Sequence, residues 1–221
     1  MQITPAILTD AFLEVQRSLE IIRYCSGVET VHIDVIDGQF ADNVTVAPLD
    51  LTVADFDPLK IDFHLMTDEP MDYVYECEAL KGYLPIRRMI GQVERMSHQQ
   101  DFVWSVKANG WEASLALNLF TPLDAIEKEV WPELDHILLL GVEAGQQGQV
   151  LHNHLFEKLH EISEMNLTRK LSVSVDGGVK LNTAPAILKY AVDELVVGSG
   201  IWHSDDPVQA IEEFNKVVGE A

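Results

Sequence analysis

The sequence predicts a single (β/α)8 barrel domain that spans residues 1–221. Short apolar runs alternate along the chain with longer amphipathic ones, and no linker rich in proline, serine or glycine divides them. Eight strands that alternate with helices over this length are typical of the (β/α)8 barrel. A doubly wound open sheet is the alternative, but the GxGxxG or P-loop pattern that it usually carries after an early strand is absent.

Eight short apolar runs are the predicted strands. They are Ile3–Leu8, Thr30–Val35, Lys60–Leu65, Ile86–Ile90, Ser114–Leu117, His136–Leu140, Leu171–Val175 and Glu194–Val197. The stretch Ser97–Trp111, between the fourth and fifth runs, leaves room for a further strand.

Four segments have the apolar period of a helix. They are Asp10–Tyr24, Met71–Leu80, His152–Met165 and Pro207–Val218. Thr9 is the expected N-cap of the first, and Pro70 suits the first turn of the second. Asn109–Gly110 is a typical helix stop.

The composition excludes several classes of partner. With 36 acidic and 15 basic residues the net charge is −21, which repels nucleic acid and anionic membranes. No apolar run is long enough to span a bilayer, and the first residues lack the features of a signal peptide. Cys25 and Cys77 stand alone, as thiols do in a reducing compartment. We therefore expect a cytoplasmic protein.

Four side chains at the ends of predicted strands form a candidate metal site. His32 and Asp34 are two residues apart on one strand, so they point the same way. His64 lies near the end of the next strand, and Asp176 follows "SVSV". In a barrel these strand ends face the active site. Two imidazoles and two carboxylates suit Zn²⁺, Fe²⁺, Mn²⁺ or Co²⁺ without choosing among them. Asp37 lies beyond its strand, and we interpret it with Gly38 as a turn.

Three glycine-bearing loops are candidates for binding phosphate. They follow the sixth, seventh and eighth predicted strands and read "GVEAGQQGQ" (Gly141–Gln149), "DGGV" (Asp176–Val179) and "GSG" (Gly198–Gly200). Glycines let backbone N–H groups approach an anion closely, and barrels often bind phosphate after their last two strands. Uncharged donors would let an acidic protein hold a phosphate.

The motifs of this sequence resemble those of the ribulose-phosphate 3-epimerase family over nearly the whole chain. "VHIDVIDGQFADNVT" is similar to that family's HxDxMDGxFxPNxT segment, and "IDFHLMTDEPMDYV" to its HLM segment. "LNLFTPLDAIE", "VDGGV" followed by "NTAP", and "LVVGSGIWHSDDP" continue the likeness in the same order. The DxKxxD pattern of decarboxylase and synthase relatives on the same barrel is absent.

The resemblance implies a metal-dependent epimerase that interconverts D-ribulose 5-phosphate and D-xylulose 5-phosphate at C3. A divalent metal on His32, Asp34, His64 and Asp176 would acidify the C3 proton and stabilise the enediolate. Asp34 and Asp176 would act as acid and base on opposite faces of the carbon. The resemblance also implies substrate contacts, an apolar cap and a homo-oligomer. The substrate contacts would be His64, Gly145, Gly148, Gly177, Gly178, Gly198 and Ser199. The cap would consist of Ile36, Met66 and Leu140.

Several positions depart from the family pattern. Ala6 replaces a substrate-contacting serine, Gln92 replaces a histidine, and "EAGQQGQ" (Glu143–Gln149) replaces NPGFGGQ. We interpret all of these as changes on the substrate side, with the metal and acid/base set intact. Two alternatives therefore stay open: the same chemistry on another ketose phosphate, such as a hexulose 6-phosphate, and a non-catalytic sugar-phosphate-binding paralogue.

Overall fold

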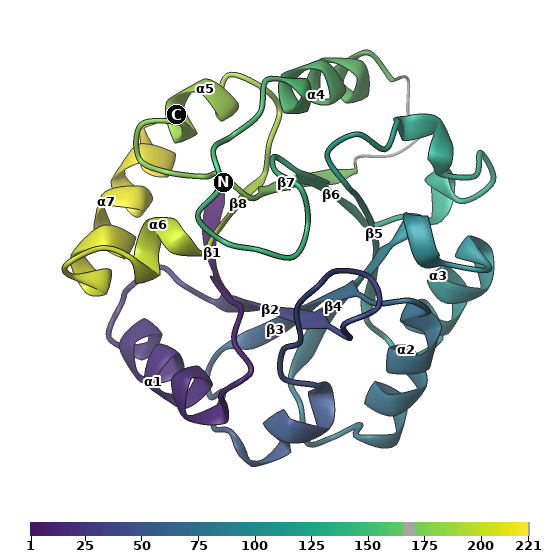
Figure 1. Cartoon of the computed structure of the whole chain (residues 1–221), viewed down its shortest axis with the longest axis horizontal. Helices are drawn as coiled ribbons and strands as arrows, with labels where there is room; N and C mark the ends of the chain where they lie inside the picture. The colour runs from purple at the N-terminus through teal and green to yellow at the C-terminus, as the bar shows by residue number, and fades with distance from the viewer. Residues whose placement is uncertain (166–170, 221) are drawn as a thin grey trace.

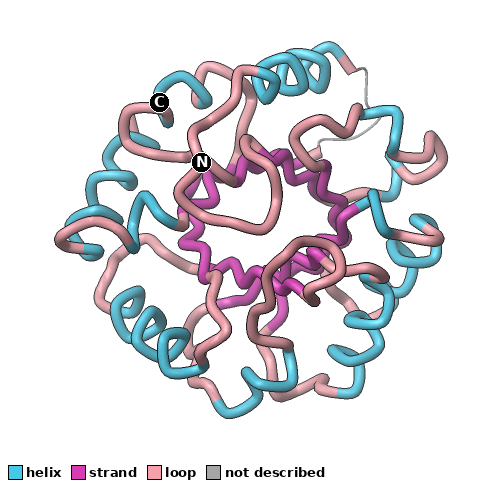
Figure 2. Tube along the Cα trace, viewed as in Figure 1, coloured by secondary structure: helices cyan, strands magenta, loops and turns pink. Residues whose placement is uncertain are grey.

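The computed structural model describes residues 1–165 and 171–220, and it shows a closed barrel of eight parallel strands with helices outside it (Figures 1 and 2). The strands follow one another around the barrel in sequence order, and β1 pairs with β8 to close the ring. The predicted fold class is confirmed.

Every predicted strand is present, with each end within two residues of its predicted position. The strands are β1 (Gln2–Ile7), β2 (Thr30–Ile36), β3 (Lys60–Met66), β4 (Ile86–Gln92), β5 (Glu112–Leu117), β6 (His136–Leu140), β7 (Ser172–Asp176) and β8 (Glu194–Val197).

The helices form the outer ring. They are α1 (Phe12–Arg23), α2 (Pro70–Ala79), α3 (Gln99–Ala108), α4 (His154–Glu164), α5 (Ala184–Ile187), α6 (Ser199–Trp202) and α7 (Pro207–Gly219). Short 3-10 helices occupy Pro48–Val53, Val93–Arg95, Leu123–Ala125 and Trp131–Glu133. The four predicted helices correspond to α1, α2, α4 and α7.

The stretch Ser97–Trp111 holds helix α3 and no strand. Phe102, Val103 and Val106 are fully buried there, at the spacing of one helix face. The predicted helix stop is confirmed, because α3 ends at Ala108 and Gly110 has a φ of +82°.

The start of α1 differs from the prediction. Ala11 is the N-cap and the helix begins at Phe12, so the Thr9 cap was wrong. The Thr9 hydroxyl instead accepts a hydrogen bond from the backbone N–H of Ala11 and donates one to Glu14. Thr9 therefore fixes the turn that leads into the helix.

The inside of the barrel has two distinct zones. Toward the amino-terminal ends of the strands lies an ionic cluster of Asp62, Arg87, Arg88 and Glu194. A separate apolar cluster consists of Ala6, Ile90, Ala116, Leu138, Leu140 and Val196. Side chains that point outward from the strands, such as Ile33 and Phe63, belong to the larger core that includes buried helix residues.

Cys25 and Cys77 are free and buried. Within the described residues, no helix is long and apolar enough to cross a membrane.

Candidate active site

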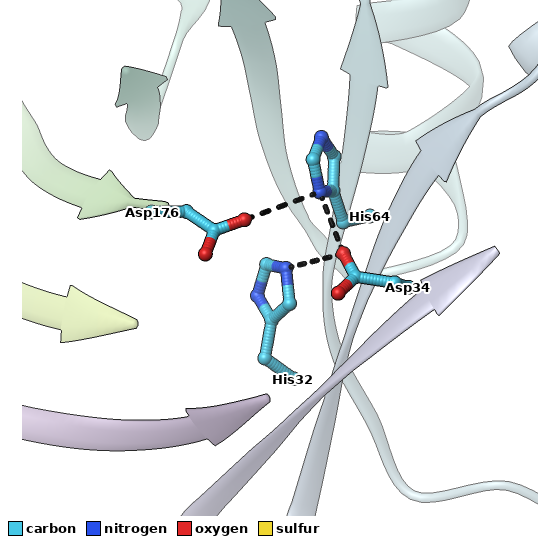
Figure 3. A group of neighbouring side chains, drawn as sticks. All are labelled: His32, Asp34, His64 and Asp176. Atoms are coloured by element: carbon cyan, nitrogen blue, oxygen red, sulfur yellow. Dashed lines mark hydrogen bonds and ion pairs between the residues drawn. The ribbon is translucent and has the colours of Figure 1, made fainter. Parts of the chain in front are cut away.

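The four predicted metal ligands converge at the carboxyl ends of β2, β3 and β7 (Figure 3). One ligand atom from each of His32, Asp34, His64 and Asp176 lies within 4.8 Å of all the others. The Asp34 Oδ1 atom lies 2.9 Å from Nδ1 of His64 and 3.3 Å from Nε2 of His32. Asp176 Oδ2 lies 3.8 Å from the same nitrogen of His64.

The strand register brings these side chains together. His32 and Asp34 share one face of β2, and Asp34 pairs with His64 across the β2–β3 ladder. Asp176 is the last residue of β7, opposite Leu140 of β6. His32 and Asp34 therefore point into the barrel together, as the sequence predicts.

The donor set fits a divalent cation. His32 is fully buried, and among the described residues its Nδ1 atom has no hydrogen-bond partner, while its Nε2 atom lies 3.3 Å from Asp34 Oδ1 without forming a well-aligned hydrogen bond. A buried polar atom without a partner is costly, and a cation that accepts a nitrogen lone pair would remove this cost. Two imidazole nitrogens and two carboxylate oxygens at this spacing match Zn²⁺, Fe²⁺, Mn²⁺ or Co²⁺ equally well.

The two carboxyl groups have pKa values that are pushed apart. Burial raises the pKa of Asp34, but the close imidazoles of His32 and His64 outweigh it and lower the pKa to about 2. Burial and the negative charge of Asp34 raise the pKa of Asp176 to about 6. Two carboxyls whose surroundings push their pKa values apart are typical of an acid/base pair.

A cavity opens above the cluster, and Asp34 and Asp176 line it. All six predicted phosphate contacts from the loops also line it: Gly145, Gly148, Gly177, Gly178, Gly198 and Ser199. His64 is fully buried beneath Asp34. Of the three predicted cap residues, Met66 and Leu140 line the cavity, whereas Ile36 is buried outside the lining.

Two glycines are required by the way the loops meet. Gly178 has a φ of +72°, and a Cβ there would lie 2.7 Å from the backbone of Leu151. Gly145 has a φ of +107°, and a Cβ there would lie 2.6 Å from that of Ala41. Asn43 Nδ2 also donates to the Gly145 carbonyl at 3.1 Å, so the loops after β2 and β6 touch each other.

Asp37 has the turn role that the sequence predicts. Its Oδ1 atom accepts hydrogen bonds from the N–H groups of Gln39 and Phe40, and its Oδ2 atom accepts one from Asp68. Gly38 has a φ of +79°. Asp37 therefore joins the loops that follow β2 and β3.

Two glutamines near the site have roles that the sequence did not reveal. Gln92 is fully buried and contacts His64, so it lies behind the four predicted metal ligands and not on the substrate side, and the interpretation of Gln92 as a substrate-side change was wrong. The sequence could have indicated this position, because Gln92 and Arg88 are four residues apart on β4 and therefore point to the same, inward side of the strand. The side chain of Gln147 covers Gly198, where a Cβ would lie 3.0 Å from Nε2 of Gln147. No pattern in the sequence indicated that contact.

Comparison with known protein families shows which family the chain belongs to. Residues 2–202 match the family described as the ribulose-phosphate 3 epimerase family. The chain belongs to the ribulose-phosphate 3-epimerase family. The ribulose-phosphate 3-epimerase of Bacillus subtilis (strain 168) is 31% identical over 219 residues, which cover 97% of this chain and 98% of that protein. The enzyme of the same name from Synechocystis is 28% identical over 95% of this chain and 90% of its own length. Members of this family are carbohydrate isomerases.

Solved structures share the fold of this ribulose-phosphate 3-epimerase family member at low identity. The 3-hexulose-6-phosphate synthase from Salmonella typhimurium has a TM-score of 0.68 at 15% identity, covering 100% of this chain and 99% of that one. KGPDC from Streptococcus mutans has a TM-score of 0.70 at 15% identity, covering 99% and 97%. At this identity the likeness concerns the barrel alone.

Proposed function

We propose that this protein is a divalent-metal-dependent epimerase that interconverts D-ribulose 5-phosphate and D-xylulose 5-phosphate by inverting C3. One observation carries the proposal. Two carboxylates and two imidazoles converge within 4.8 Å at the base of a cavity whose rim is made of glycine loops. Membership of the ribulose-phosphate 3-epimerase family supports the same reaction.

His32, Asp34, His64 and Asp176 would hold the metal ion. A divalent cation bound there supplies positive charge that stabilises the negative charge left on the substrate when the C3 proton departs. The burial of His32 and His64 keeps water away from the ligands, which strengthens electrostatic interactions at the site.

Asp34 and Asp176 are the proposed acid and base. They come from β2 and β7, which are not neighbours in the barrel, so they can address C3 from two sides. Inversion requires one group that removes the proton and another that delivers a proton to the opposite face. The lowered pKa of Asp34 keeps it ionised, so that it can accept the proton, and the raised pKa of Asp176 lies nearer neutral pH, where that group can both hold and release a proton. In the reverse direction the roles exchange.

The rest of the cavity would position the substrate. Gly177, Gly178, Gly198 and Ser199 line the cavity, and backbone N–H groups of these loops would bind the phosphate. Met66 and Leu140 provide apolar surface beside the carboxylates, which favours a dry reaction site.

A second candidate substrate has specific support. Ala6 lines the cavity at the position where the family pattern has a substrate-contacting serine, and Gln147 covers Gly198. Both changes alter the substrate side without touching the acid/base pair. The same chemistry on another ketose phosphate, such as a hexulose 6-phosphate, is therefore the alternative.

Deuterium exchange separates these candidates. Metal-loaded protein is incubated in D₂O with ribulose 5-phosphate, xylulose 5-phosphate and a panel of longer ketose phosphates, and deuterium at C3 is followed by NMR. Exchange with the pentulose phosphates supports the main proposal, and exchange with a hexulose phosphate alone supports the second. Exchange with none of them contradicts both and favours a non-catalytic paralogue. Treatment with a chelator is expected to abolish the exchange.

We also propose that the chain forms a homo-oligomer in the cytoplasm and binds neither nucleic acid nor membranes. The net charge of −21 supports the last two points. Light scattering coupled to gel filtration tests the oligomer, and fractionation of the source cells tests the location.

A further inference from the structure

The carboxamide of Gln92 has an orientation that its neighbours dictate. One end of it faces two hydrogen-bond acceptors, the Ala116 carbonyl at 3.2 Å and Oε2 of Glu94 at 2.8 Å. That end must be the nitrogen, which donates to both. The other end is the oxygen, and it lies 3.0 Å from Nε2 of His64. Glu94 is itself held, because its Oε1 atom accepts from the N–H of Asn118 at 2.7 Å.

This orientation determines which nitrogen of His64 can bind a metal. An oxygen of Gln92 at Nε2 requires that Nε2 carry the proton, since a lone pair there would face a second lone pair. The Nδ1 atom then has its lone pair directed at the site, where Asp34 Oδ1 lies at 2.9 Å and Asp176 Oδ2 at 3.8 Å. A cation placed among these three atoms satisfies all of them.

We propose that Gln92 is a positioning residue that presents Nδ1 of His64 to the metal. The inference rests on the proposed metal site and adds to it the outer partner that orients one ligand. Such partners fix the ring and make the ligand more basic, and their loss commonly weakens metal binding by about 10–100-fold. Gln92 is fully buried and does not line the cavity, so it acts through His64 and not through the substrate.

The chain offers a matched control. Gln99 is also a buried glutamine whose carboxamide makes two backbone hydrogen bonds, to the Ala125 carbonyl at 2.8 Å and from the Glu127 N–H at 3.0 Å. These contacts involve none of the four proposed ligands. Gln99→Leu therefore removes a comparable buried amide without disturbing His64.

The test measures metal affinity directly, with Zn²⁺ competed by a chromophoric chelator. Gln92→Leu is expected to bind Zn²⁺ about 10–100-fold more weakly than the unaltered protein. Gln99→Leu is expected to leave the affinity unchanged. The double variant Gln92→Glu with Glu94→Gln keeps the net charge and an acceptor at Nε2 of His64, and it lets residue 94 donate to residue 92. The hydrogen bond to the Ala116 carbonyl is lost, but the acceptor at His64 is kept, so this variant is expected to bind Zn²⁺ more tightly than Gln92→Leu.

A spectroscopic readout keeps the inference testable even where Gln92→Leu fails to fold. In the Zn²⁺-loaded unaltered protein, long-range ¹H–¹⁵N correlation is expected to show His64 protonated at Nε2 and bound through Nδ1. Coordination through Nε2, or equal affinities for Gln92→Leu and Gln99→Leu, overturns the role of Gln92 but leaves the metal site standing. Failure of the unaltered protein to bind Zn²⁺, Mn²⁺, Fe²⁺ or Co²⁺ overturns the metal site and this inference together.

Discussion

Asp34 and Asp176 share one imidazole: Nδ1 of His64 lies 2.9 Å from a carboxylate oxygen of Asp34 and 3.8 Å from one of Asp176. The two acids are brought to this nitrogen by strands that are not adjacent, β2 and β7. Two carboxylates this close disfavour each other's ionisation, which explains why only one of them has a raised pKa.

Replacement of Asp176 by asparagine separates its chemistry from its packing. The amide has the same shape but cannot move a proton, so C3 exchange should fall by at least about 10²–10⁴-fold. The metal-free protein should unfold at no lower urea concentration than the unaltered protein, because the repulsion with Asp34 is removed. Deuterium exchange and urea unfolding followed by circular dichroism measure the two effects. Full exchange activity in a folded Asp176→Asn protein would contradict the two-acid assignment.

Loss of Arg88 should destabilise the fold strongly. Arg88 is 3% exposed, and its guanidinium donates to Glu194 at 3.1 and 3.2 Å and to Asp62 at 3.2 Å. Arg88→Met leaves buried carboxylates with fewer partners, which should lower the free energy of unfolding by about 3–5 kcal/mol. Urea unfolding measures this loss.

Arg95→Met is the control for Arg88→Met. Arg95 pairs with Asp68 at 3.5 Å, and both side chains are about half exposed. Its loss should change the free energy of unfolding by less than about 1 kcal/mol. Equal effects of the two substitutions would show that Arg88 contributes no more to stability than an exposed ion pair does.

Gly178→Ala should disturb the proposed phosphate loop. The new Cβ would meet the Leu151 backbone at 2.7 Å, so the loop must shift. Phosphate inhibition of exchange should weaken, and the Michaelis constant should rise more than the turnover number falls. Steady-state kinetics with inorganic phosphate as competitor measures both.

Gly82→Ala controls for backbone strain alone. Gly82 has a φ of +97°, and a Cβ there would have no neighbour within 4 Å. It should lose about 1–3 kcal/mol of stability without any change in phosphate inhibition. Similar kinetics for the two alanine variants would argue against a phosphate site at Gly178.

Lys158 should give the protein a specific pH dependence of stability. Burial outweighs the attraction of Glu94 and Glu161 and lowers the pKa of this lysine from 10.5 to about 8. Between these values the unfolded chain holds a proton that the folded chain has lost, so stability relative to Lys158→Met rises with pH from 8 to 10.5. The slope cannot exceed about 1.4 kcal/mol per pH unit. Urea midpoints for the two proteins across that range test this, and a falling difference would contradict the assignment.

Most of the barrel could be predicted because each buried strand is a short apolar run that the local sequence alone reveals. Runs such as His136–Leu140 and Glu194–Val197 were predicted with their observed ends. The parity of His32 and Asp34 placed them on one face. Helix α3 was missed because its polar positions interrupt a short apolar period, although Phe102 and Val106 carry the signal.

What the sequence could not supply are contacts between distant segments. Arg88 of β4 meets Glu194 of β8 across the barrel interior, and nothing near either residue predicts the other. The bond between Gln92 and His64 likewise depends on the β3–β4 register, which shifts between Ile61 and Asp62. Such pairings follow from the closed ring and not from local pattern.

The pairing of β1 with β8 has a consequence for how this molecule is made. The four proposed metal ligands lie between positions 32 and 176, so a ribosome synthesises all of them before Glu194–Val197 emerges. The ring closes only when that last strand docks beside Gln2–Pro5. The indole N–H of Trp202, further along the chain, donates to the carbonyl of Ala6 in the closed barrel. A nascent chain therefore carries every proposed metal ligand while still lacking the wall that encloses them, and assembly of the pocket waits for the final stage of translation.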